Sequence, residues 1–220
     1  MMGLRGCRLG LLYPEIYEMQ ARAIINAALE VKTEEGFTPN PEIMIPLVGN
    51  ELELSRLRRL VEHVKIDLDL DNQLGDIKIG TMIEVPRACL VADKIAQHAD
   101  YFSFGTNDLT QMTLGFSRDD SGTFIRKYKE QKILQEDPFQ KIDQEGVGEL
   151  IKMAIERGKQ QNPTLKIGVC GEQAGDADSV EFFNTLDLDY ISCSPFRIQK
   201  ARLAAAQAEM KQNVKERDLV

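Results

Sequence analysis

Two carboxylates, Glu84 and Asp108, stand at the ends of two apolar, strand-like runs of this 220-residue chain. The first run, residues 77–85, is rich in β-branched residues, and Pro86 ends it because proline has no N–H to donate to a sheet. The second run starts at Tyr101 and passes through Gly-Thr-Asn before Asp108. Oxygen ligands with no His or Cys beside them favour Mg²⁺ or Mn²⁺ over zinc. The pair therefore predicts a divalent-cation site; alternatively, each is a solvated carboxylate, or Asp108 caps a helix.

A thiol, Cys170, ends a third strand-like run at residues 166–170. Alternatively, Cys170 is a small buried hydrophobic residue, as most free cysteines are. Its place at a strand end favours acid/base chemistry instead, because a nearby metal or arginine would lower the thiol pKa from about 8.5 and let it exchange a proton with carbon. Cys7, Cys89 and Cys193 are interpreted as structural, and the absence of C-x-x-C spacing predicts four free thiols.

Three small or polar residues, Gly105, Thr106 and Asn107, precede Asp108 and are predicted to form a short loop. Its amide and hydroxyl donors suit a carboxylate or phosphoryl oxygen, and a plain turn is the alternative. The loop is therefore a candidate substrate contact.

Helical and strand-like runs alternate along the chain, with little that resembles a domain linker. The strand-like runs cover residues 43–48, 77–85, 101–104, 166–170 and 190–193. The helical patterns cover residues 14–35, 51–69, 87–99, 146–159, 179–185 and 194–211. This alternation predicts a parallel sheet with crossover helices, whose strands carry the chemistry at their carboxyl ends. Five strands are too few to close a (β/α)8 barrel, so the chain is interpreted as a piece of one.

Composition narrows the class of protein. A hydrophobic content of 43% is enough for one sizeable core, and a net charge of −8 argues against a nucleic-acid surface. No apolar stretch approaches the roughly 20 residues of a membrane span, and the first residues lack a signal-peptide core. We expect a cytoplasmic protein with no membrane or nucleic-acid partner.

Several ordered motifs resemble the phosphoenolpyruvate (PEP)-binding domain at the C-terminus of the pyruvate, phosphate dikinase family. They lie at residues 103–113, 117–120, 137–139, 146–148, 170–172 and 192–197. The resemblance covers the whole chain as a single partial domain, residues 1–220. It implies the later part of a (β/α)8 TIM-type barrel, present here as about five strands.

The resemblance also implies a reaction. In the family, Mg²⁺-dependent phosphoryl transfer between a phosphohistidine and the pyruvate enolate interconverts pyruvate and PEP, within the conversion of ATP, phosphate and pyruvate to AMP, diphosphate and PEP. It implies Mg²⁺ on Glu84 and Asp108, and Cys170 as the acid/base at C3 of the substrate. The substrate-binding residues that it implies are Arg5, Glu84, Gly105, Thr106, Asn107, Asp108 and Arg118. Arg118 has the alternative of a surface arginine paired with Asp119 or Asp120.

The start of the chain, Met-Met-Gly-Leu-Arg-Gly, matches a motif inside the family's barrel, so Met1 is expected to be internal to a longer protein. His63 and His98 lie in helical patterns rather than in a phosphocarrier loop. The phosphohistidine and ATP-grasp domains are therefore expected outside this chain, which alone is expected to be inactive. PEP synthase and enzyme I of the phosphotransferase system are the alternatives within enzymes. An inactive dimerisation module is the alternative from another class: the resemblance implies association through this domain, and the helical pattern at residues 194–211 offers small and apolar residues for packing.

One position departs from the family's pattern. The family usually has histidine after Cys-Gly-Glu, and this chain has Gln173. Glutamine forms hydrogen bonds but does not titrate, so a proton-relay role at this position is in doubt.

Overall fold

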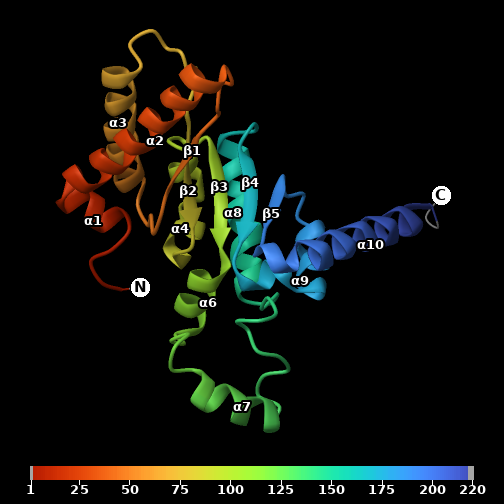
Figure 1. The fold of residues 1–220 in the computed structure, drawn as a ribbon. Coiled ribbons are helices and arrows are strands. Elements are labelled where there is room, and N and C mark those ends of the chain that lie inside the picture. Colours follow the sequence, from red (N-terminus) through yellow and green to blue (C-terminus); the bar gives the residue numbers. More distant parts are fainter. Residues whose placement is uncertain (1, 218–220) are drawn as a thin grey trace.

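A five-stranded parallel sheet, with its strands in chain order, forms the centre of the computed structural model, which describes residues 2–217 (Figure 1). The strands are β1 Glu42–Ile45, β2 Lys78–Ile83, β3 Tyr101–Gly105, β4 Lys166–Cys170 and β5 Tyr190–Ser192. All five predicted strands are present, with bounds shifted by a few residues. The predicted parallel sheet is therefore confirmed. Within the described residues β1 and β5 each pair with a strand on one side, so the sheet is open.

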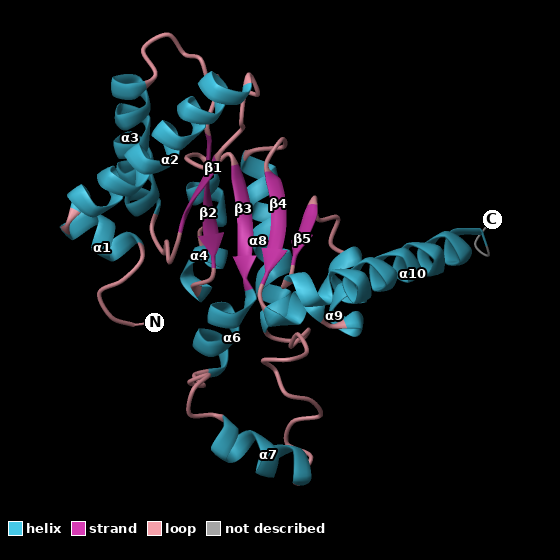
Figure 2. Cartoon of the chain, viewed as in Figure 1, coloured by secondary structure: helices cyan, strands magenta, loops and turns pink. Residues whose placement is uncertain are grey.

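Helices connect the strands (Figure 2). They are α1 Cys7–Leu12, α2 Pro14–Glu35, α3 Glu51–Leu68, α4 Pro86–Leu90, α5 Ala92–Ala96, α6 Thr106–Leu114, α7 Gly122–Glu130, α8 Val147–Gln161, α9 Ala177–Asn184 and α10 Ile198–Arg217, with the 3-10 turns η1 Glu172–Gly175 and η2 Pro195–Arg197. Helix α3 begins at Asn50, whose side chain accepts from the backbone N–H of Leu52, while Glu53 bonds back to the Asn50 N–H. Sequence signals of this kind explain why α2 and α3 were predictable.

Two predictions on the elements are wrong. The helix predicted over residues 87–99 is two short helices, α4 and α5, that meet at Val91, where φ −122° and ψ 27° are not helical. The loop predicted at residues 105–107 does not exist, because Gly105 is the last residue of β3 and Thr106 begins α6. The strand therefore passes directly into a helix. Asp108 lies in the first turn of that helix rather than at its cap.

Helices cover one face of the sheet (Figure 2). All five residues of the central strand β3 are buried. Helix α8 packs on α4 and α5 over one face of the sheet, where Phe102, Ile151 and Ala154 belong to the core. This core fixes the strands whose carboxyl ends carry the candidate site.

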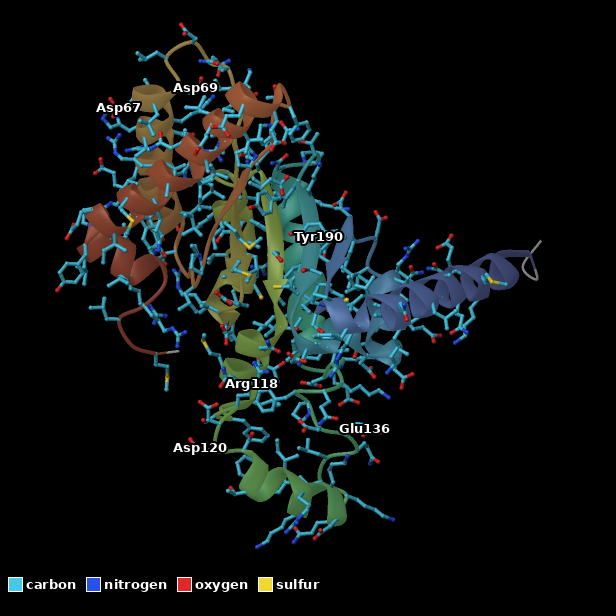
Figure 3. The ribbon with its side chains drawn as sticks, in the orientation of Figure 1. Asp67, Asp69, Arg118, Asp120, Glu136 and Tyr190 are labelled. Carbon is cyan, nitrogen blue, oxygen red and sulfur yellow. The ribbon has the colours of Figure 1, made fainter. Side chains whose placement is uncertain are left out.

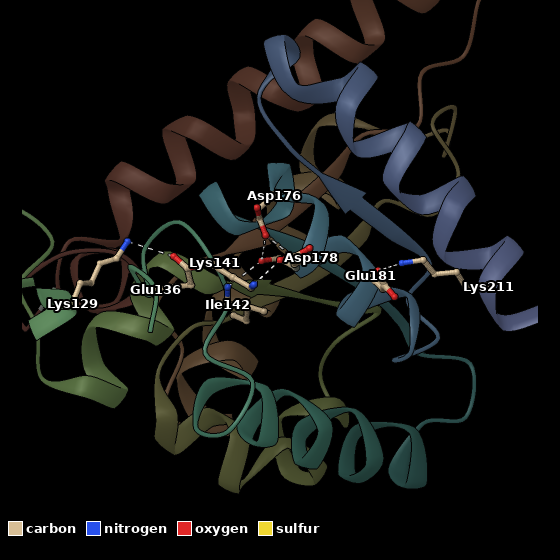
Figure 4. A network of polar contacts seen from close by, with 9 residues as sticks. Lys129, Glu136, Lys141, Ile142, Asp176, Asp178, Glu181 and Lys211 are labelled. Atoms are coloured by element: carbon tan, nitrogen blue, oxygen red, sulfur yellow. Dashed lines mark hydrogen bonds and ion pairs between the residues drawn. The ribbon is translucent and has the colours of Figure 1, made fainter. Parts of the chain in front are cut away.

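The segment that contains α7 lies beyond the carboxyl ends of the strands (Figure 1). Polar contacts attach its returning end to α9 (Figure 4). The Lys141 ammonium pairs with Asp178, and the Ile142 N–H donates to Ser179 Oγ at 3.0 Å. Asp176 accepts from both the N–H and the hydroxyl of Ser179 at 2.9 Å. This end of the α7 segment is therefore fixed to the body of the protein.

Helix α10 extends away from the sheet (Figure 1). It packs on α9 through the buried Ala204 and Ala208, and Lys211 pairs with Glu181 at 2.6 Å. Leu203 and Met210 are exposed. Within residues 2–217, none of the helices combines the length and the apolar character needed to cross a membrane.

Candidate functional site

The register of the sheet brings three strand ends together. Ile83 pairs with Phe104, and Gly105 pairs with Cys170, so Glu84 follows β2 beside the end of β3 and the end of β4. The carboxyl ends of parallel strands are where barrel and α/β enzymes build their sites. The three candidate positions therefore share one edge of the sheet.

Glu84 is a buried carboxylate, only 4% exposed. Its pKa is raised to about 7, mainly by burial, and the negative charge of Asp108 and a hydrogen bond with that residue contribute to this rise. The Leu47 N–H, which donates to Glu84 Oε1 at 2.7 Å, and the charge of Arg5 both oppose this rise. Glu84 is therefore not a solvated carboxylate at a strand end, which was the alternative interpretation. Leu47 was not identified from the sequence, because its amide reaches Glu84 only through the tertiary fold.

Gly105 makes room for the Glu84 side chain. A Cβ at this position would lie 2.5 Å from Glu84 Oε2 and 2.9 Å from Glu84 Cβ. The second atom is close to the backbone and has little freedom to move. Any side chain at position 105 would therefore displace the carboxylate.

We expect Gly105→Ala to lower the free energy of unfolding by roughly 1–3 kcal/mol, because the added methyl group would overlap the Glu84 side chain. Gly122→Ala is the matched control, since a Cβ there meets nothing within 4 Å. Chemical denaturation of both variants measures the difference. Equal stability of Gly105→Ala and the wild type would show that Glu84 is not held where the structure places it.

Asp108 faces Glu84 from the first turn of α6 and accepts from the Gln111 side-chain amide at 3.1 Å. The two carboxylates come from β2 and α6 and share a hydrogen bond, which needs a proton while no cation separates them. Mg²⁺ is commonly held by one or two carboxylates, with waters and substrate oxygens completing its shell. Among the described residues no group of three or more His, Cys, Asp or Glu side chains has the geometry of a metal site. The two carboxylates of Glu84 and Asp108 fit a hard divalent cation that keeps open coordination positions for substrate and water.

Thr106 and Asn107 connect α6 to the loop after β4. The buried Thr106 hydroxyl oxygen lies 2.8 Å from the Cys170 carbonyl oxygen and 2.7 Å from Gln173 Oε1. Asn107 Oδ1 accepts from the Glu172 N–H at 3.1 Å. The Thr106 hydroxyl and the Asn107 side-chain oxygen thus join α6 to the loop after β4. The side-chain NH2 of Asn107 remains the donor best suited to a ligand.

Cys170 ends β4 with its thiol half-buried. Ser103 Oγ donates to its Sγ at 3.7 Å, and Met82 Sδ lies 3.8 Å from it. Burial raises the pKa of the thiol; the Ser103 hydroxyl opposes this, and the charges of Glu84 and Asp108 add to the rise. A lowered thiol pKa was predicted from the sequence. The structure differs because the charged neighbours of the thiol are carboxylates rather than arginines.

The other cysteines are also free thiols. Cys7 and Cys89 are buried, and burial raises the pKa of each to about 12. Such thiols are unreactive near neutral pH.

The two candidate arginines lie on opposite sides of the site. Arg5 is exposed, and its charge reaches Glu84. Arg118 follows α6 (Figure 3). Its guanidinium lies 3.8 Å from Oε1 of Glu172, the first residue of η1. The predicted alternative of a local partner for Arg118 is therefore wrong in the part of the chain that the structure describes.

Gln173 is a fully buried polar residue beside the site. Its side-chain amide donates to the Pro138 carbonyl at 2.8 Å, and its Oε1 lies 2.7 Å from the Thr106 hydroxyl. It thus joins η1, α6 and the segment that returns from α7. Glutamine suits this position because both ends of its amide have partners.

The chain is similar in sequence to known proteins. The chain is 58% identical over 209 residues to pyruvate, phosphate dikinase 2 of Zea mays, covering 94% of this chain and 23% of that protein. It is 56% identical over 214 residues to pyruvate, phosphate dikinase of Clostridium symbiosum, covering 96% of this chain and 24% of that protein. The chain thus spans about a quarter of the length of the curated relatives it matches.

The resemblance found in the sequence is confirmed by a match of the family described as PEP-utilising enzyme, PEP-binding domain, to residues 1–210. This match covers every element from α1 to the first turns of α10. The chain therefore belongs to the family of PEP-utilising enzymes and carries its PEP-binding domain.

Proposed function

We propose that this chain carries out the PEP/pyruvate half-reaction of a pyruvate, phosphate dikinase. The observation that carries the proposal is the convergence of Glu84, Asp108 and Cys170 at one edge of the sheet. The identity of 56–58% with pyruvate, phosphate dikinases supports it. The phosphoryl group would come from a phosphohistidine on a swivelling domain outside this chain.

The residues divide the chemistry between them. Glu84 and Asp108 would hold Mg²⁺, which when bound supplies positive charge to the carboxylate and the developing enolate oxygen of the substrate. Cys170 donates a proton to C3 when PEP is converted to pyruvate, and its raised pKa keeps the thiol protonated for this step at neutral pH. In the opposite direction the thiolate must form, and neutralising the two carboxylates would favour it. Arg5 and Arg118 would balance charge on the transferring phosphoryl group.

We further propose that the open sheet belongs to the later part of a (β/α)8 barrel and that the protein forms a homodimer. The parallel order of the five strands and the unpaired edges of β1 and β5 suit the barrel. The exposed Leu203 and Met210 on α10 suit a helix-mediated contact between two copies.

Oxalate, which mimics the enolate of pyruvate, tests the assignment of the site. We expect calorimetry to detect oxalate binding when Mg²⁺ is present and little binding when it is replaced by EDTA, because two carboxylates without a cation repel a dianion. Malonate at the same concentration is a control for general anion binding. Equal affinity for oxalate with and without Mg²⁺ would contradict the proposed function.

A further inference from the structure

One carboxylate holds two arginines at the edge of the site. Glu172 Oε1 lies 3.8 Å from Arg118, and its Oε2 lies 3.8 Å from Arg197. The three side chains come from different segments: Arg118 follows α6, Glu172 begins η1, and Arg197 ends η2. All three side chains are close to half exposed, so solvent reaches both ion pairs. The arrangement is a pair of cations converging on one removable anion.

The direction of Arg197 is set by packing. A Cβ on Gly175 would lie 2.2 Å from Arg197 Cδ, so the aliphatic part of the arginine lies directly on this glycine. The backbone of Glu172 is equally fixed, because its N–H donates to Asn107 Oδ1 at 3.1 Å. The guanidinium is therefore held near Glu172, while the Glu172 carboxylate alone is free to move.

The same residues line a cleft of about 850 Å³ between η1, η2 and the α7 segment. Its basic lining residues are Arg118, Arg126, Lys129, Arg197 and Lys200. The other acids of the cleft have partners of their own: Glu130 pairs with Arg126 on α7, Asp137 accepts from a backbone N–H, and Asp176 caps α9. Glu172 is the acid whose two oxygens face the converging arginines.

We propose that Glu172 is an internal competitor for an anionic ligand of this cleft. In the free protein its carboxylate occupies Arg118 and Arg197, and a phosphoryl group displaces it and binds both guanidinium groups. A planar guanidinium binds phosphoryl oxygens bidentately, whereas exposed ion pairs at 3.8 Å are weak, so the exchange favours a dianion. Arg197 thereby joins Arg118 as a phosphoryl-binding arginine of this cleft. This inference rests on the proposed function, which places a phosphoryl group beside Arg118.

Titration of the complete protein with inorganic phosphate at constant ionic strength tests the competition. We expect Glu172→Gln to tighten phosphate binding by roughly two- to fivefold, the range that the loss of exposed ion pairs gives. Arg197→Ala should weaken it by at least as much and should cancel the gain when the two substitutions are combined. Arg202→Ala is the control, because Arg202 lies on α10 and lines a different groove. A tighter complex cannot result from a misfolded variant.

Unchanged or weaker phosphate binding in Glu172→Gln would overturn the inference, as would unchanged binding in Arg197→Ala. No phosphate binding by the wild type and Glu172→Gln would overturn it as well. Mg²⁺-dependent oxalate binding by the wild type tests the proposed function separately from the competition by Glu172. If oxalate fails and the phosphate series holds, the proposed function fails alone; the reverse result removes only the competition by Glu172.

Discussion

Glu84→Gln and Asp108→Asn are each expected to lower the Mg²⁺-dependent turnover of the complete enzyme by at least roughly 10²-fold. Either amide removes one of the two negative charges that would hold the cation, and removing one charge-stabilising group from an enzyme site commonly costs this much. Asp119→Asn is the matched control, because Asp119 is an exposed acid close in sequence to Asp108. Steady-state rates at saturating Mg²⁺ measure the effect, and oxalate binding in the same variants should be lost.

Loss of fold would not explain such a result. In the cation-free protein the pKa of Glu84 is raised from 4.5 to about 7, mainly by burial. The folded state therefore binds the proton more tightly than the unfolded state, and ionisation of Glu84 costs stability as pH rises from about 4.5 to about 7. Glu84→Gln removes this cost, so above pH 7 in EDTA the variant should be at least as stable as the wild type by chemical denaturation. Wild-type turnover in either variant would refute the metal assignment.

The strands and most helices were predictable because their signals are local. Apolar runs ended by proline or glycine predicted β2 and β4, and regular helical spacing predicted α2. Helices α1, α6 and α7 were missed, and α6 is the one that carries a candidate site residue. The residues at the start of α6, Gly-Thr-Asn-Asp, have weak helix propensity and are typical of turns, but the pairing of Gly105 with Cys170 fixes the strand end from which the helix starts.

The candidate site was predictable in its chemistry but not in its electrostatics. Glu84 and Cys170 were identified as site candidates because each lies at the end of a predicted strand, and parallel strands end at a common edge. The raised pKa of Cys170 was missed, since it depends on burial and on how close the carboxylates lie in the fold. Arg197 was not among the predicted site residues; its place just after the end of β5 was the available signal. Its approach to Glu172 depends on packing against Gly175, which no local pattern predicts.

Cys170→Ala is expected to lower the rate of conversion of pyruvate to PEP by roughly 10²–10⁴-fold, the range that general acid/base groups contribute. The thiol is the titratable group on β4 that adjoins the two carboxylates, and the hydroxyl of Ser103 beside it is a far weaker acid. Cys170→Ser should be almost as inactive for the same reason. Cys193→Ala is the matched control, because Cys193 is also half-buried and directly follows a strand end.

The proton-transfer step itself distinguishes catalysis by Cys170 from a role in binding. Solvent deuterium should enter the methyl group of pyruvate in the wild type and in Cys193→Ala, and should enter at a greatly reduced rate in Cys170→Ala. Oxalate affinity in the presence of Mg²⁺ should change little in Cys170→Ala, because Glu84 and Asp108 remain. Phosphorylation of the enzyme by ATP should also persist, since the proposed function places that step on domains outside this chain. Deuterium exchange at the wild-type rate in Cys170→Ala would mean that another group moves the proton, and the thiol would then be only a buried neighbour of the site.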